Sequence, residues 1–146
     1  MKATLGRAVA ALWVLVLSAG ISIAGASTKF ASTQAIDATG SLVVSFEKGS
    51  LKRFDAVDYQ LDATAIAVWD LGNGQSTGVL YQPRATITLA PDPKGRVTGT
   101  LTLDISQSGG CTCGGTLQHV EYTDLTLTNL TSSHVYRLDS TSRDYP

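Results

Sequence analysis

The stretch VDYQLDATAIAVWDL, residues 57–71, decides the fold, because its apolar side chains recur at every second position. Apolar residues fill every odd-numbered position, whereas most even-numbered positions are polar. Period two over this length predicts one long strand with one buried face and one solvent face. Ala63, Ala65 and Ala67 are small, which indicates that a bulky side chain or another backbone approaches the buried face there. Trp69 shares that face, so we expect it in the core.

Shorter alternating stretches surround this strand, and they end at turn residues such as Asn73-Gly74 and the segment PDPKG at 91–95. About seven or eight short strands, with turns roughly every eight to twelve residues, predict an all-β chain. We expect a single antiparallel β-sandwich domain, with a small closed β-barrel as the alternative. The further strands are expected at residues 41–47, 77–81, 84–89, 97–105, 116–128 and 134–138, and residues 27–38 form either a leader or a first edge strand.

The segment 116–128 changes the phase of its apolar residues twice. Leu117 lies on odd numbering, Val120 and Tyr122 lie on even numbering, and Leu125 returns to odd numbering. An extra residue in a strand produces such a change, since it turns all following side chains to the opposite face. We therefore predict one β-bulge near Gln118 and another near residues 123–124.

The first 26 residues have the order of a secretory signal peptide. Lys2 and Arg7 precede an apolar core at residues 8–17, and small residues follow up to Ala24-Gly25-Ala26. The pattern predicts a signal peptide at residues 1–26 and a secreted β-sandwich domain at residues 27–146. A membrane anchor is the alternative, but serines and glycines dilute the apolar segment.

The charge of the mature chain gives no general attraction for polyanions. Removal of Lys2 and Arg7 leaves nine basic and twelve acidic side chains, a net charge of −3. The acidic residues are spread singly, and Lys52-Arg53 is the one basic cluster along the sequence. This distribution argues against nucleic acid as a partner and, after signal cleavage, against a membrane.

The chain has two cysteines, Cys111 and Cys113, inside the glycine-flanked stretch SGGCTCGG at 108–115. We predict a disulfide between them, because the secreted compartment is oxidising and the glycines permit the turn that the bond needs. A loop of three residues gains only about 1.6 kcal/mol from this bridge. A copper(I) or zinc site, a redox role, or a bond to another chain are the alternatives.

His119 and Glu121 follow the cysteines and share one side of the same predicted strand. Together with Cys111 and Cys113 they would make a plausible zinc ligand set. The competing interpretation is that both side chains face solvent while Val120 faces the core. No other cofactor is indicated.

The sequence offers little for catalysis, because it has none of the usual hydrolase, zinc-protease or phosphate-loop motifs. Asn129-Leu130-Thr131 matches the N-glycosylation pattern, at a turn that we expect to be exposed. An exposed aromatic pair would form a contact surface for sugar or protein.

Three functional hypotheses follow from these features. The first is a secreted, non-catalytic β-sandwich that binds a protein or carbohydrate through its loops and carries the Cys-x-Cys loop. The second is a small extracytoplasmic metal-binding or thiol-redox protein that uses that loop. The third is a secreted hydrolase.

Overall fold

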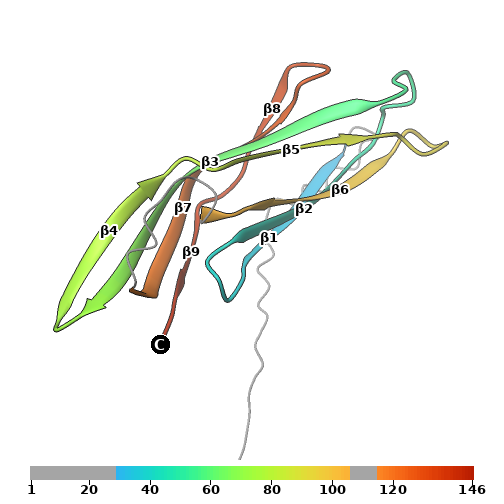
Figure 1. Cartoon of the computed structure of the whole chain (residues 1–146). Coiled ribbons are helices and arrows are strands. Elements are labelled where there is room, and N and C mark those ends of the chain that lie inside the picture. The colour runs from blue at the N-terminus through green and yellow to red at the C-terminus, as the bar shows by residue number, and fades with distance from the viewer. Residues whose placement is uncertain (1–28, 106–114) are drawn as a thin grey trace, which may run out of the picture.

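The computed structural model describes residues 29–105 and 115–146, and within these ranges the chain forms nine strands (Figure 1). They are β1 (Phe30–Ile36), β2 (Leu42–Lys48), β3 (Val57–Gly72), β4 (Gln75–Tyr81), β5 (Arg84–Leu89), β6 (Val97–Leu103), β7 (Thr116–Asn129), β8 (His134–Arg137) and β9 (Thr141–Asp144).

The strands form two antiparallel sheets that pack together as a β-sandwich, as the alternating stretches predict. The smaller sheet has the order β1-β2-β6. In the larger sheet the long strands β3 and β7 pair along their length, and each carries two short strands on its other edge. β3 pairs with β5 at its start and with β4 at its end, while β7 pairs with β9 and β8. The described strands do not close into a barrel, so that alternative is wrong.

Both predicted bulges of β7 are present. The register between β3 and β7 shifts once at Gln118, which is the extra residue between Leu117 and His119. It shifts again beside Asp124, which has a φ of 52°. Positive φ is uncommon outside glycine but is tolerated by aspartate, and a bulge is where strands use it. The bulges keep apolar residues on the core side of β7 although their sequence phase changes.

The core lies between the sheets and contains the odd-numbered residues of β3 up to Ala67. Ala65 lies opposite Tyr81 on one neighbouring strand and Tyr122 on the other, which accounts for the small residue. Tyr122 also joins the sheets, because its hydroxyl donates to the carbonyl of Gly40 at 2.6 Å. Burial raises the pKa of Tyr122 well above its usual value.

Two expectations need correction. The chain has nine described strands rather than the expected seven or eight. Residues 141–144, which have no apolar alternation, form the ninth strand because their backbone pairs with residues 119–122 of β7. Trp69 packs against the core but is only half-buried, and its Nε1 is shielded without a hydrogen-bond acceptor among the residues that the structure describes. Within the described residues, no helix has the length and hydropathy needed to cross a membrane.

Candidate functional site

The two cysteines lie outside the described residues. The disulfide between Cys111 and Cys113, and the metal and redox alternatives that depend on them, therefore stay predictions. The segment that holds them joins the end of β6 to the start of β7.

His119 lies on the outer face of β7, away from the core. Its Nδ1 is 2.6 Å from Oδ1 of Asp144 on β9, in a pair whose aspartate is almost fully exposed. Glu121 points to the same outer face, where the sheet register places it between Ile66 and Ser142. No group of three histidine, cysteine, aspartate or glutamate side chains in the described ranges converges as metal ligands would. The predicted zinc set is thus represented here by His119 and Glu121 alone.

Asn129 is the last residue of β7 and only 1% exposed, whereas the turn that follows it at residues 130–133 is exposed, as the sequence predicts. Its Oδ1 accepts hydrogen bonds from the backbone N–H groups of Thr131 and Ser132. Its Nδ2 donates to the hydroxyl of Tyr59 at 3.5 Å. Asn129 therefore builds the turn after β7, and glycosylation at its amide stays a prediction.

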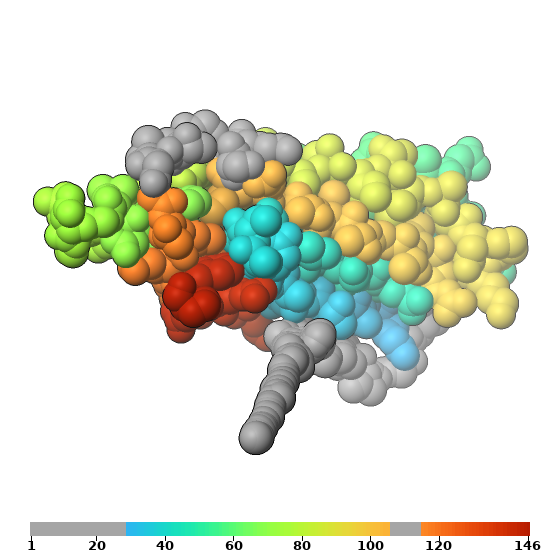
Figure 2. Space-filling view, turned by 60° about the horizontal axis from the view of Figure 1, so that its bottom comes forward, coloured from blue at the N-terminus to red at the C-terminus, as the bar shows by residue number. Residues whose placement is uncertain are grey.

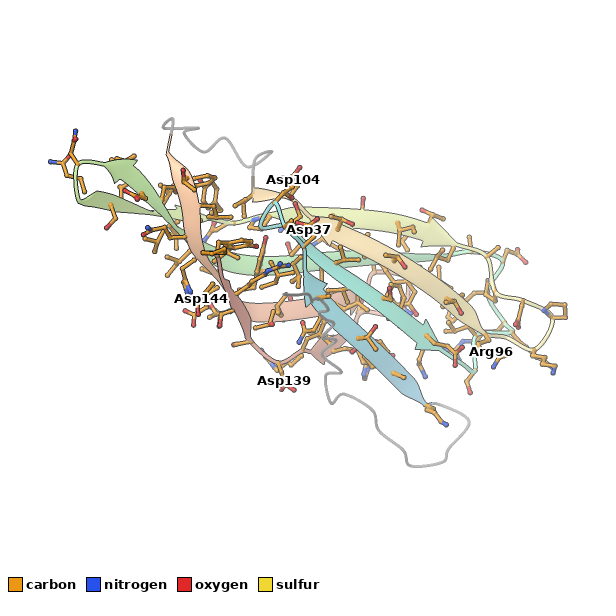
Figure 3. The ribbon with its side chains drawn as sticks, turned by 90° about the horizontal axis from the view of Figure 1, so that it is seen from below. Asp37, Arg96, Asp104, Asp139 and Asp144 are labelled. Atoms are coloured by element: carbon orange, nitrogen blue, oxygen red, sulfur yellow. The ribbon has the colours of Figure 1, made fainter. Side chains whose placement is uncertain are left out.

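A basic cleft of about 570 Å³ lies at the end of the sandwich opposite the β3–β4 hairpin. Figure 2 shows the two ends of the sandwich, with the β3–β4 hairpin in green at the left and the turn between β5 and β6 in yellow at the right. Figure 3 shows Arg96 at this end, far along the strands from Asp37 and Asp104. The cleft is lined by Gly49, Ser50, Lys52, Arg53, Lys94 and Arg96.

Two loops form the basic cleft, and Gly95 holds them together. Its carbonyl accepts a hydrogen bond from the N–H of Leu51 at 2.8 Å. A Cβ at Gly95 would lie 2.7 Å from the side chain of Lys52 and 2.8 Å from its backbone nitrogen. Gly95 also has a φ of 82°, which disfavours other residues. A glycine is therefore required where the two basic loops meet.

Asp92 shapes the second loop through its side-chain oxygen. Its Oδ1 accepts hydrogen bonds from the backbone N–H groups of Lys94 and Arg96 at 2.8 and 2.9 Å. The hydrogen bond from Arg96, with smaller contributions from the Lys94 N–H and both cations, holds the pKa of Asp92 below its usual value. Asp92 thus stays ionised and keeps the turn in place.

Most of the positive charge in the cleft has no carboxylate partner among the described residues. Arg96 lies 3.9 Å from Glu47 and 3.7 Å from Asp92, both long contacts. Neither Lys52 nor Lys94 forms an ion pair with any residue that the structure describes. The guanidinium of Arg53 lies over the ring of Phe54 at 4.7 Å. Four of the chain's eleven cationic side chains thus meet at one open cleft, which can bind an anionic group.

Sequence reasoning found only half of this cleft. It recognises Lys52-Arg53 as a basic cluster, whereas it places Lys94 in the predicted turn at 91–95 and Arg96 directly after that turn. The sequence does not show that β2 pairs with β6. This pairing places Lys48 opposite Val97, so the loop after β2 lies beside the loop before β6. Strand pairing between distant segments is not encoded in local alternation. The useful signal is that two cations lie in or next to each of the two connecting segments, at 52–53 and at 94 and 96.

A second, smaller groove of about 310 Å³ runs between the edges of β1 and β8. The rings of Phe30 and Tyr136 stack there with centroids 4.0 Å apart, and His134 lies against Tyr136 at 4.5 Å. The two stacked rings are each half-buried and face one another. Their faces are therefore occupied by each other, and they offer less to a ligand than the basic cleft.

Comparison of the chain with models of protein families, with curated proteins and with solved structures found no match in any of the three.

Proposed function

We propose that this chain is a secreted, non-catalytic β-sandwich module that binds an acidic carbohydrate in the basic cleft. The observation that carries the proposal is the meeting of Lys52, Arg53, Lys94 and Arg96 around one open cleft. Guanidinium and ammonium groups bind carboxylate or sulfate through charge-assisted hydrogen bonds. Binding modules often present such groups on loops that a rigid scaffold positions.

The composition of the cleft favours a sugar over a protein. Protein interfaces obtain most of their binding energy from buried aromatic or other large anchors in apolar pockets. The cleft is lined only by glycine, serine, lysine and arginine. Uronic acid or sulfated sugar residues have charged groups for the cations and hydroxyls for the backbone of Gly49 and Ser50. A protein ligand is the competing outcome of the test.

The net negative charge of the mature chain is consistent with a local rather than a general attraction. Glu47 and Asp92 are the acidic residues found in ion-pair contact with the cleft, both through Arg96, among the described residues. Screening by salt at physiological strength acts over about 8 Å, so only groups that enter the cleft experience its cations strongly.

The test is calorimetric titration of the secreted protein with oligogalacturonate, a heparin-derived oligosaccharide and a neutral glucan oligosaccharide. We expect binding of an acidic sugar that weakens with salt, and no binding of the neutral one. Arg53→Glu or Lys94→Glu should weaken binding about tenfold or more, the effect of losing one charged hydrogen bond. Arg137→Glu is the matched control, because it makes the same charge change on exposed β8, outside the cleft.

Two results would overturn the proposal. One is the absence of binding to either acidic sugar at low ionic strength. The other is equal weakening by Arg53→Glu and Arg137→Glu, which would mean that net charge rather than the cleft governs binding. Selective binding of an acidic peptide instead of the sugars would replace carbohydrate with protein as the ligand.

A further inference from the structure

Within the described ranges, the outer edge of β4 has no protection of the kind that other edges in this fold have. Among the described strands β4 hydrogen-bonds only to β3, so no described strand pairs with the backbone groups of its other edge (Figure 1). Natural edge strands avoid pairing with other chains through charges, proline, bulges or a covering segment. The seven residues QSTGVLY of β4 contain no charge and no proline.

The other described edges are charged or covered. β8 carries Arg137 and β9 carries Arg143. β1 has no charge, but its Ile36 carbonyl accepts a hydrogen bond from Arg143, and the side chain of its Gln34 donates to the Asp139 carbonyl. β5 and β6 lie beside each other across the turn that joins them. Among the described strands, β4 is therefore the edge that is open.

Two residues of β4 have no explanation among the contacts that the structure describes. Leu80 is 61% exposed, the most exposed large apolar residue of the described ranges. Gly78 interrupts the strand although a Cβ there would meet no described atom within 4 Å. Gly99 on β6 is different, because a Cβ there would lie 2.7 Å from Leu89. A strand glycine with open space above it often marks the close approach of another chain.

We propose that β4 pairs with β4 of a second copy of this chain, antiparallel, so that the larger sheet continues from one copy into the other. With Val79 on the two-fold axis, Leu80 of each copy lies opposite Gly78 of the other. The side chain of Leu80 then covers the space above that glycine. Side chains two residues apart in a strand share a face, so Gly78 and Leu80 lie on the same side of the sheet. The two-fold axis therefore repeats the contact between Leu80 and Gly78 on both sides of Val79.

The neighbouring strand extends the fit. Ile66 lies beside Leu80 on the outer face, and Val68 lies beside Gly78. In the paired arrangement, Leu80 lies between Ile66 of its own chain and Val68 of the second copy. Ile66 is 40% exposed and Val68 half-buried, so this row would remove apolar surface from water. A second copy is favoured over an unrelated strand, because Leu80 and Gly78 complement each other within one sequence.

The test is sedimentation velocity of the secreted protein from micromolar to millimolar concentration, with hydrogen exchange of the β4 amides. We expect a monomer–dimer equilibrium and exchange of the β4 amides that slows as concentration rises. Leu80→Lys should weaken association at least tenfold. Gly78→Val should do the same while the melting temperature stays equal or rises, because valine favours strands and its side chain has room in the monomer.

Val135→Lys is the matched control, since Val135 is a 47% exposed apolar residue on a different edge strand. It should leave association unchanged. A wild-type protein that stays monomeric throughout the range would overturn the proposal. So would a dimer that survives both β4 substitutions, or one that Val135→Lys disrupts equally.

Discussion

The two halves of β3 have the same alternation of side chains but a different cover. In the first half, Val57, Tyr59 and Leu61 are fully buried, and Tyr59 contacts Phe46 of the smaller sheet with ring centroids 4.8 Å apart. In the second half Trp69 is half-buried and Leu71 is 41% exposed. Alternation therefore predicts which face of a strand points towards the core, whereas the burial of that face depends on whether another sheet packs over it.

The largest expected difference in the free energy of unfolding is between substitutions of two leucines in the larger sheet. Leu61 is fully buried, whereas Leu80 is 61% exposed. Leu61→Ala should lower the free energy of unfolding by about 2–5 kcal/mol, because it removes core contacts and leaves a cavity. Leu80→Ala should change it by less than about 0.5 kcal/mol in dilute, monomeric protein. Urea denaturation of both variants measures the difference.

Similar losses for the two leucines would contradict the comparison, since they would mean that the β3–β4 end is covered as well as the other. Equal slopes of the denaturation curves are the control that both variants unfold from the same compact state.

A second test uses the tyrosine in the covered half. Burial, with a smaller contribution from Tyr136, raises the pKa of Tyr59 to about 12. An unfolded tyrosine ionises near pH 10, so the folded state holds its proton more tightly. The stability from this protonated form is complete below about pH 10 and is lost as pH rises towards about 12. Tyr59→Phe should remove about 2 kcal/mol of that alkaline loss.

The measurement is the free energy of unfolding of wild type and Tyr59→Phe at several pH values between neutral and strongly alkaline. Tyr122, whose pKa is also raised by burial, remains in both proteins, so some alkaline loss should persist in the variant. Parallel pH curves for the two proteins would show that water reaches Tyr59 in the folded state.

These contrasts also explain how far the sequence could lead. It predicted the sandwich, the long strand and both bulges, because alternation and its phase are local properties. It missed β9, because the four residues of this strand have no apolar alternation, although their backbone pairs with β7. It placed Asn129 on an exposed turn, because a sequence pattern does not indicate that an amide folds back onto its own turn. It found half of the basic cleft, because the other half depends on the pairing of β2 with β6.

The smallest expected effect concerns the cysteine pair, which follows β6 and precedes the less covered end of β7. We predict that Cys111 and Cys113 are bonded to each other and that the double substitution Cys111→Ser, Cys113→Ser still folds. Closing a three-residue loop stabilises the folded state by at most about 1.6 kcal/mol in the chain-entropy model, and strain reduces this. The hydrophobic core between the two sheets should keep the double variant folded without the disulfide.

Urea denaturation of the double variant and a thiol assay on the native protein test this prediction together. Two reactive thiols in the native protein would contradict the bond. A double variant that fails to fold would contradict the energetic argument, because so short a loop cannot account for the whole stability of a domain. That result would instead favour a bound metal at the two sulfurs, since metal binding can supply folding free energy that a short disulfide loop cannot. A variant that folds and binds acidic sugar normally would show that the basic cleft works without the two cysteines.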